Sequence, residues 1–359
     1  MLVAMSLSRF AGDEVSPLGE RPFRLLLAAS ALDLGGAETH VVSQVQMLQQ
    51  LGVQVQVVSQ GGRLVAALDA AGIVHHLLPL HSRRPDALLR SVRSMHRLLV
   101  EERIDIVHAH ARIPAWVADQ ARRSASVQLG RPVPLVTTYH GLYNAGPFWR
   151  LFTRWGDQVI AVSDDVRQHL ITHLGADAAL VRVIPNGIPL EPAEPGARAE
   201  LAIPSAAPVV VHVSRLSEFT QTALALCAAM PEVVNRHPEA HAVIVGTGDH
   251  YNDVARAAAA VNRRFGQSRI HLTGGRTDVL RFLREATVGV GVGRSALEMM
   301  AAGLPVIISG SGGYGGVLDP PRLELFAAHN FTARGLPGAH EIQAEIGRAH
   351  VCTPVTFRN

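Results

Sequence analysis

The sequence predicts an α/β fold built from two doubly wound, Rossmann-like domains with a ligand cleft between them. Short apolar runs of strand length alternate with helical segments along most of the chain, a pattern typical of parallel sheets covered by helices on both faces. A stretch rich in proline and alanine interrupts this alternation, and 359 residues is a length typical of two domains. We expect a first domain at 21–187, a linker at 188–208 and a second domain at 209–335.

The first domain is expected to alternate strands and helices from its start. The apolar runs that predict strands are Phe23–Ala29, Val53–Ser59, Ile73–Leu78, Ile104–His108, Pro134–Thr138, Gln158–Val162 and Val181–Pro185. Helical patterns fill the intervals, at about 38–51, Arg63–Ala71, Asp86–Glu102, about 114–125 and Asp164–Leu174. Between the first strand and helix, Gly35 and Gly36 would let the backbone approach a ligand closely.

The second domain repeats the pattern after the linker. Its expected strands are Val209–Val213, Ala242–Gly246, Ile270–Thr273, Val288–Val292 and Leu304–Ile308. Its expected helices are Gln221–Arg236, Asp253–Phe265, Asp278–Glu285 and Ala296–Ala302. Between the first strand and helix of the chain, the segment around Gly35 and Gly36 lacks the GxGxxG spacing that marks a dinucleotide site, which disfavours a nicotinamide dehydrogenase.

The stretch Val288–Pro305 carries the clearest sign of a site. A strand is expected to end at Gly293-Arg294-Ser295, and a helix then runs to Gly303. The start of such a helix presents backbone N–H groups and the positive end of its dipole to a phosphate. Glu298, one turn further on, suits ribose hydroxyls as a hydrogen-bond acceptor. The alternative is that Arg294 and Glu298 form an ordinary surface pair at i, i+4.

Composition limits the chemistry that the chain can use. All 33 basic residues are arginine, so a lysine Schiff base and a phosphate-binding lysine of the Walker type are excluded. The net charge of +3 is too small to indicate a nucleic-acid partner. Two cysteines, Cys227 and Cys352, give no disulfide framework, and no apolar run is long enough to span a membrane. We therefore expect a cytoplasmic location.

Both ends of the chain are expected to lie outside the fold. Residues 1–20 have no long apolar segment and are interpreted as a disordered tail. Residues 336–359 are interpreted as a second tail. Within it Ile346–Thr356 resembles a translated sequencing adapter, so we expect 346–359 to be non-native and the second domain to be truncated.

Several motifs, in this order along the chain, resemble the GT-B glycosyltransferases of family 4. They are LGGAETH at 34–40, TYHG at 138–141, VIAVS at 159–163, IPNGI at 184–188, SRLS at 214–217, VIVGTG at 243–248 and LEMMAAGLPVI at 297–307. The segments HAHARIPAW at 108–116 and GGYGG at 312–316 resemble one bacterial branch of that family. The resemblance runs from residue 23 to about residue 335.

The resemblance implies a nucleotide-diphosphate sugar as donor, held mainly by the second domain. Glu298 matches the glutamate that binds the donor ribose, and Arg215 matches the arginine at the diphosphate. Gly35 and Gly36 match the glycine loop near the diphosphate, and Gly246, Gly248 and Ser295 are also expected at the donor. His140 matches a histidine near the transferred sugar and is the candidate catalytic residue. No metal or other cofactor is implied, because the sequence has no DxD motif. The family's usual reaction retains the anomeric configuration.

Two positions depart from the family pattern. A lysine usually follows the arginine, but Thr220 stands at that position, and the first of two paired glutamates is replaced by Val290. Arg294 is expected to supply the missing positive charge at the donor. If the two losses abolish turnover, the chain would be a non-catalytic subunit that binds a glycan or a nucleotide sugar. A sugar-nucleotide epimerase on the same fold is a further alternative.

The acceptor is expected on the first domain, beside His108, His110 and Arg112. His108 and His110 are two residues apart and would share one face of a strand. A metal pair would need a third ligand, and none is evident, so a structural or acceptor-side role is favoured. The helix expected at Asp86–Glu102 is amphipathic and suits a membrane surface or packing on its own sheet, with packing favoured. The resemblance implies a glycan or lipid-linked acceptor in cell-envelope synthesis, with peripheral contact at the inner face of the membrane.

Overall fold

A computed structural model describes residues 22–189, 194–217 and 220–334. The expected tails at 1–20 and 336–359, including the adapter-like segment from Ile346, lie outside the described residues, as do residues 190–193, Glu218 and Phe219. The chain divides into two compact units, Met1–Gly187 and Ile188–Asn359, here called unit 1 and unit 2. Each is an α/β unit built on a mainly parallel sheet, which confirms the predicted fold class.

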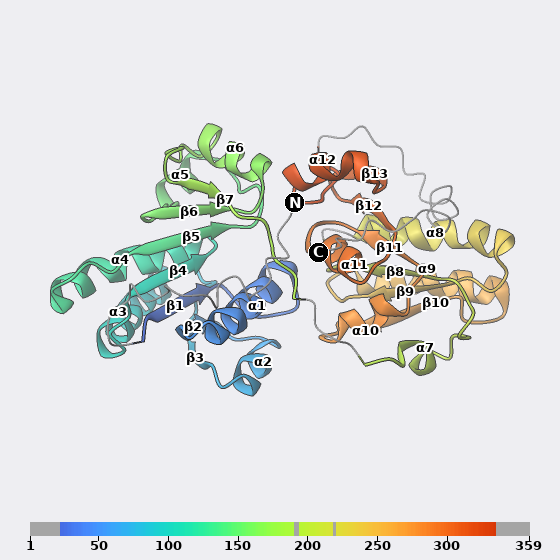
Figure 1. The fold of residues 1–359 in the computed structure, drawn as a ribbon, viewed down its shortest axis with the longest axis horizontal. Helices are drawn as coiled ribbons and strands as arrows, with labels where there is room; N and C mark the ends of the chain where they lie inside the picture. The colour runs from blue at the N-terminus through green and yellow to red at the C-terminus, as the bar shows by residue number, and fades with distance from the viewer. Residues whose placement is uncertain (1–21, 190–193, 218–219, 335–359) are drawn as a thin grey trace. The chain divides into compact units, whose positions relative to one another are not determined.

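Unit 1 has a parallel sheet of seven strands in the order β3-β2-β1-β4-β5-β6-β7 (Figure 1). The strands are β1 (Arg24–Ala29), β2 (Gln54–Ser59), β3 (Val74–Leu77), β4 (Ile106–His110), β5 (Leu135–Tyr139), β6 (Gln158–Ala161) and β7 (Val181–Val183). The helices are α1 (Gly36–Gln50), α2 (Val65–Ala70), α3 (Pro85–Glu101), α4 (Arg112–Leu129), α5 (Pro147–Phe152) and α6 (Asp164–Thr172). The strand order reverses between β1 and β4, and the carboxyl end of such a pair is where doubly wound folds place ligands.

Alternate residues of β1 fill two cores. Leu26 and Ala28 pack with α3 and α4 on one face of the sheet, whereas Leu25 and Leu27 pack with α1 and α2 on the other. The period of two in a strand produces this division. The apolar side of α3 belongs to the first of these cores, where Met95 and Leu99 are fully buried. The amphipathic pattern of this helix therefore reflects packing within unit 1.

Unit 2 has a sheet of six strands in the order β10-β9-β8-β11-β12-β13. Its strands are β8 (Val209–Val213), β9 (His241–Val245), β10 (Ile270–Gly274), β11 (Val288–Gly291), β12 (Val306–Gly310) and β13 (Gly313–Val317). Its helices are α7 (Ala197–Glu200), α8 (Thr220–Arg236), α9 (Tyr251–Phe265), α10 (Val279–Arg284), α11 (Gly293–Ala301), the 3-10 turn η2 (Pro320–Arg322) and α12 (Leu323–Ala328). The edge strand β13 runs antiparallel to β12.

The second half of the expected linker is a folded part of unit 2. Ala197, Ile203 and Ala207 are buried in its core. The carboxylate of Glu285 accepts hydrogen bonds from the backbone N–H groups of Gly196 and Arg198, which fixes the start of α7. The Pro- and Ala-rich composition suggested a linker because it has little periodicity, yet its scattered apolar side chains are sufficient to anchor a short segment.

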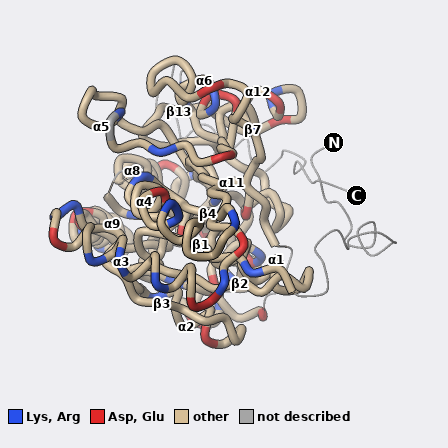
Figure 2. The backbone as a smooth tube through the Cα atoms, turned by 90° about the vertical axis from the view of Figure 1, so that its left-hand side faces the viewer, with Lys and Arg blue, Asp and Glu red and all other residues tan. Residues whose placement is uncertain are grey.

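Charged residues of both signs are interspersed along the helices (Figure 2). Among the residues that the structure describes, no helix is both long and apolar enough to cross a membrane.

Candidate functional site

The turn between β11 and α11 forms the first part of the candidate site. α11 begins at Gly293 rather than at Ala296, so Arg294 and Ser295 lie in the first helical turn. The predicted helix was too short because glycine and serine are weak helix formers. Gly293 has a φ of +58°, which favours glycine at this position. The hydroxyl of Ser295 donates to the carbonyl of Val292 over 2.9 Å and closes the turn.

Arg294 and Glu298 form an ion pair inside unit 2. The guanidinium Nε lies 2.8 Å from Oε1 of the carboxylate, and the side chains are only 7% and 20% exposed. The i, i+4 pairing is therefore real, but it is not the solvated surface pair considered above. Burial raises the pKa of Glu298, and the neighbouring Arg294 opposes that increase. Among the described residues, Oε2 of Glu298 receives no hydrogen bond, so Arg294 holds only one oxygen of the carboxylate.

Two glycines explain why β11 reads VGVG. A Cβ atom on Gly289 would lie 2.5 Å from Sδ of Met299, and one on Gly291 would lie 3.2 Å from Cε of the same side chain. α11 therefore packs on its own strand at a distance that only glycine permits. This close packing fixes the position of the helix start. Val290, which replaces the first paired glutamate, is fully buried in the core.

The turns after β8 and β9 form the second part of the candidate site. Arg215 lies exposed in the first turn, and Gly246 and Gly248 lie in the second. A Cβ on Gly246 would lie 1.9 Å from the carbonyl oxygen of Ser214, and one on Gly248 would lie 2.6 Å from that of Leu216. Both glycines have positive φ values, +153° and +158°. The two turns are thus held in direct backbone contact, and these glycines position the loop that carries Arg215.

His212 is a residue of this region that the sequence interpretation missed. It is buried in β8, where Nδ1 lies 2.8 Å from the carbonyl of Val290 and Nε2 lies 2.8 Å from the hydroxyl of Ser214. Because a carbonyl only accepts, Nδ1 carries the proton and Nε2 accepts from Ser214. Burial lowers the pKa of His212 to about 4. In the sequence it is a single histidine within an apolar strand, and nothing but its residue type could have indicated a role in the site.

Thr220 occupies the position expected for a lysine. Its side chain is buried at the start of α8, and its hydroxyl donates to the carbonyl of Ser217 over 3.0 Å. It therefore stabilises the β8–α8 turn and supplies no positive charge.

Four histidines meet at the carboxyl ends of β4 and β5 in unit 1. His108 and His110 extend from β4 on the same face, as the spacing predicts, with ring centroids 4.4 Å apart. His140 follows β5 directly, and His40 comes from the first turns of α1, with its ring 5.2 Å from that of His140. Sequence reasoning missed His40, although the residue lies within the motif at 34–40. The four residues come from three separate segments of the chain.

A hydrogen bond joins His110 and His140. Nδ1 of His110 lies 2.9 Å from Nε2 of His140, while Nε2 of His110 is buried without a partner among the described residues. A buried N–H without an acceptor is rarer than a buried acceptor without a donor. We therefore assign the proton of His110 to Nδ1, which donates to His140. In this arrangement His140 carries its proton on Nδ1.

The buried histidines are held in their neutral form. Burial and the proximity of His40 lower the pKa of His108 to about 3. The pKa of His110 is also lowered far below its ordinary value, by burial first and then by His108, His140 and His40. His108 is fixed further by Thr138, whose hydroxyl lies 2.7 Å from its Nε2. Within the described parts of the chain, no group of histidine, cysteine and acidic residues is arranged to hold a metal ion.

The glycines at the start of α1 and the arginine at the start of α4 lie at the same edge of the sheet. Gly35 is the N-terminal cap of α1, with its carbonyl accepting from the N–H of Thr39 over 2.9 Å, and Gly36 is the first helical residue. Arg112 is the first residue of α4 and is buried. Gly35, Gly36, the histidines and Arg112 thus belong to unit 1. Arg215, Gly246, Gly248, Arg294, Ser295 and Glu298 belong to unit 2.

Two family models match the chain and together span most of it. The model described as Glycosyltransferase Family 4 matches residues 34–192, and the model described as Glycosyl transferases group 1 matches residues 207–330. The first therefore covers the histidine cluster, and the second covers the Arg294–Glu298 pair.

Curated relatives and solved structures agree with these matches. The chain is 26% identical to the phosphatidyl-myo-inositol mannosyltransferase of Mycobacterium tuberculosis, over 82% of each chain. It is also 26% identical to the D-inositol 3-phosphate glycosyltransferase of Nocardiopsis dassonvillei, over 78% of this chain and 75% of the relative. A glycosyltransferase from Rickettsia africae has the same fold, with a TM-score of 0.64 and 21% identity over 79% of this chain and 78% of the other. HepE of Anabaena, solved with UDP, has a TM-score of 0.58 and 22% identity over 79% and 80%.

Proposed function

The chain belongs to the GT-B glycosyltransferases of the family 4 and group 1 type, and from this premise we propose that it transfers a hexose from a nucleoside-diphosphate sugar to a lipid-linked or glycan acceptor of the cell envelope, with retention of configuration. In this reaction the bond between the anomeric carbon and the β-phosphate oxygen breaks. A bond forms between the same carbon and an acceptor hydroxyl, whose proton leaves with the nucleoside diphosphate.

The observation that carries the proposal is the buried Arg294–Glu298 pair at the start of α11. We propose that Oε2 of Glu298 accepts hydrogen bonds from the ribose hydroxyls of the donor, while Arg294 keeps the carboxylate ionised and oriented. The N-terminal turn of α11 and the exposed Arg215 would stabilise the charge that develops on the departing diphosphate. Arg294 thus serves this site through Glu298, which refines the expectation that it replaces the missing lysine. Gly246 and Gly248 would serve it by positioning the Arg215 loop.

We propose that His140 contacts the transferred sugar. In the tautomer assigned above its Nδ1 carries the proton and its Nε2 accepts a hydrogen bond from His110, so His140 would orient a sugar hydroxyl rather than remove a proton. Gly35 and Gly36 would allow the backbone before α1 to approach the donor. The N-terminal turn of α11, Arg215 and the backbone before α1 would supply hydrogen-bond donors suited to a phosphate leaving group. We therefore expect no metal ion to take part.

The names of the relatives favour an acceptor that contains inositol, which is part of a lipid in one case and soluble in the other. One is named for phosphatidyl-myo-inositol and another for D-inositol 3-phosphate. We propose that this chain glycosylates an acceptor of this general kind, with His108, His110 and Arg112 on the acceptor side. A cytoplasmic enzyme that acts at the membrane surface would meet both a soluble donor and a lipid acceptor.

Calorimetry with UDP-, GDP- and ADP-sugars tests the donor site. We expect one donor to bind the wild type and the affinity to fall about tenfold to a hundredfold in Glu298→Gln, which loses the charge of an accepting carboxylate. The matched control is Glu232→Gln in α8, because Glu232 also pairs with an arginine at i, i+4, but on the surface of unit 2. Equal donor affinity in wild type and Glu298→Gln, or no donor binding at all, would contradict the proposal.

A further inference from the structure

Arg112 is a buried cation that has no acidic partner in the part of the chain that the structure describes. Its side chain lies between two aromatic rings, with the guanidinium carbon 5.3 Å from the centre of Tyr143 and 4.9 Å from that of Trp149. The residue is only 6% exposed. Its Nη2 donates to the carbonyl of Asn144 over 3.0 Å. The aromatic rings stabilise the cation through cation–π contacts, but they provide no oxygen atom to accept hydrogen bonds from its N–H groups.

The remaining donors of Arg112 are poorly satisfied. Its Nε is buried and has no hydrogen-bond partner among the described residues. In the same part of the structure no aspartate or glutamate forms an ion pair with Arg112 or accepts a hydrogen bond from it. Leaving a buried charged donor unsatisfied is costly, so a site of this kind is best explained by an anion that binds there.

A second arginine lies on the same aromatic ring. The guanidinium carbon of Arg83, in the loop before α3, lies 4.6 Å from the centre of Trp149. Arg83 is exposed and forms no ion pair within the described residues. Burial lowers the pKa of Arg112, Tyr139 and Tyr143 oppose this decrease, and the positive charge of Arg83 adds to it. An anion bound near both guanidinium groups would offset their like charges.

The backbone at Arg112 also favours an anion. Arg112 is the first residue of α4, an 18-residue helix, so the positive end of the helix dipole lies at the same point. The preceding residue, Ala111, has a φ of +86° and a ψ of 166°, a combination that is costly for alanine. This strained residue joins Arg112 directly to His110 and so places the arginine next to the histidine cluster.

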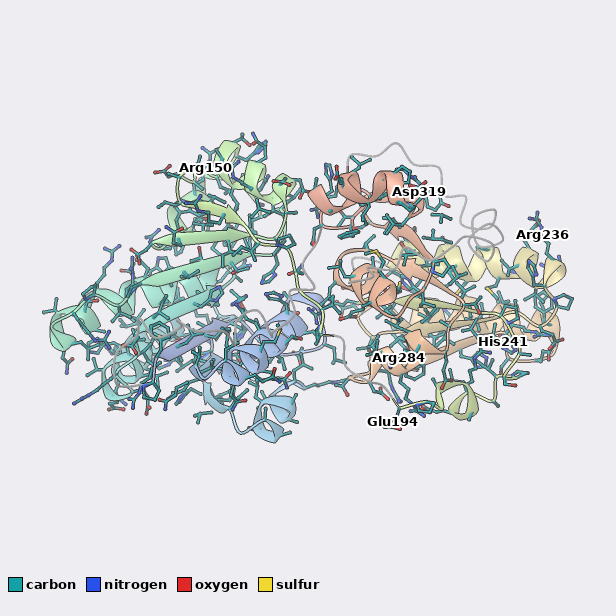
Figure 3. The ribbon with its side chains drawn as sticks, in the orientation of Figure 1. Arg150, Glu194, Arg236, His241, Arg284 and Asp319 are labelled. Atoms are coloured by element: carbon teal, nitrogen blue, oxygen red, sulfur yellow. The ribbon has the colours of Figure 1, made fainter. Side chains whose placement is uncertain are left out.

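We propose that Arg112, Arg83 and Trp149 form a phosphate subsite that binds the phosphate group of the acceptor. This inference deepens the proposed function, because it assigns the acceptor to molecules that carry a phosphate near the hydroxyl to be glycosylated. The planar fork of Arg112 would donate to two phosphate oxygens, and Arg83 would close over the anion from the solvent side. Figure 3 labels Arg150, which lies in the same short helix as Trp149 but is not part of the subsite.

Tryptophan fluorescence can detect binding of phosphate at this subsite. The chain has three tryptophans, Trp116, Trp149 and Trp155, and all of them belong to unit 1, so the signal does not report on the donor site of unit 2. We expect inorganic phosphate to change the emission of the full chain in a saturable manner and Trp149→Phe to abolish most of that change. No saturable change in the wild type, or a full change in Trp149→Phe, would overturn the proposal.

Charge variants test the role of the two arginines. Arg83→Gln and Arg112→Lys should each weaken phosphate binding about tenfold or more, the lysine variant because it retains the charge but loses the fork. Matched controls are Arg84→Gln and Arg123→Gln, which remove exposed arginines that already pair with Asp86 and Asp119. Arg83 is exposed, so its substitution tests the subsite even if the Arg112 variant folds poorly. Phosphate affinity that is unchanged in Arg83→Gln would overturn the proposal.

Two further experiments identify the molecule that carries the phosphate and distinguish a failure of this inference from a failure of the proposed function. If the ligand is a lipid headgroup, vesicles of phosphatidylcholine with phosphatidylinositol should compete with inorganic phosphate. If the ligand is a soluble acceptor, glycerol phosphate should compete and the vesicles should not. Competition by neither would overturn the proposal. Donor affinity should be unchanged in Arg83→Gln. A chain that binds phosphate at Trp149 but binds no nucleotide sugar would retain the subsite and lose the proposed function.

Discussion

The Nδ1 atom of His110 lies 2.9 Å from the Nε2 atom of His140, and the two rings stack with an angle of 20° between their planes. His110 is buried at the end of β4, whereas His140 lies in the loop after β5, so a strand residue fixes the orientation of a loop residue. Any contact that His140 makes with a substrate therefore depends on a partner that itself lies inside the sheet.

Replacement of His110 should lower turnover without weakening donor binding. In His110→Phe the ring can still stack, but the hydrogen bond to His140 is lost, and we expect kcat to fall by up to about a hundredfold, as for other small errors in orientation. His110→Asn retains an N–H near the position of Nδ1 and should recover part of the rate. Steady-state kinetics with calorimetric donor affinities will separate the two effects. Equal turnover in His110→Phe and wild type would show that the hydrogen bond has only a structural role.

Removal of the arginine from the buried pair in α11 should change both stability and pH dependence. Arg294→Gln leaves the carboxylate of Glu298 without its counter-charge, which should cost about 3 kcal/mol of unfolding free energy. The guanidinium opposes the rise in the pKa of Glu298, so its loss should raise that pKa further. Donor affinity should then fall on acidification at a higher pH than in the wild type. Calorimetric titrations across the acidic range test this, and identical pH profiles would contradict it.

The strained residue between the histidine cluster and α4 offers a stabilising substitution. Ala111 adopts a φ of +86°, and glycine has no Cβ atom to oppose this conformation. We expect Ala111→Gly to increase the free energy of unfolding by up to about 1 kcal/mol. Urea unfolding of the two proteins measures the change. A loss of stability would mean that the backbone at this position is not strained.

The pattern of apolar runs was sufficient to predict the two sheets, because both units bury their strands under helices on each face. It was not sufficient for β13, whose sequence is rich in glycine and has no apolar run. It also missed α5, a helix of only six residues, and the folded segment around Ala197. Short elements of this kind are determined by contacts with the rest of the unit, which periodicity does not reveal.

The candidate site, like the fold, was predicted from the sequence only in part. Glu298, Arg294 and the histidines of β4 were identified because their spacing on a helix or a strand places them on one side. Several contacts that hold the site were not identified, since the hydrogen bond from Nδ1 of His212 to the carbonyl of Val290 and the burial of Arg112 between Tyr143 and Trp149 join segments far apart in sequence. No local pattern reports such contacts.

Acid should destabilise the protein through its buried neutral histidines. The pKa is lowered to about 3 for His108 and to about 4 for His212 and His241. Below about pH 6.5 the unfolded chain therefore binds more protons than the folded one, so stability falls as the pH is lowered. Each such histidine should cost about 2 kcal/mol between about pH 7 and about pH 5. Urea unfolding at several pH values tests this, and His212→Asn should show a smaller slope.

The glycine in the turn after β9 should be intolerant of any side chain. In Gly246→Ala the new Cβ atom would overlap the carbonyl oxygen of Ser214, 1.9 Å away, so the loop that carries Arg215 must move. We expect a loss of about 3 kcal/mol or more in stability and a weaker affinity for the donor. Thermal unfolding and donor calorimetry measure the two effects.

Gly266 provides the matched control for this substitution. It also has a positive φ, +66°, but a Cβ atom there would meet nothing within 4 Å. Gly266→Ala should therefore cost only about 1 kcal/mol, the ordinary penalty for alanine in a left-handed conformation, and should leave donor affinity unchanged. If the two alanine variants lose the same stability and bind the donor equally well, backbone conformation alone explains Gly246, and the contact between the two turns does not position Arg215.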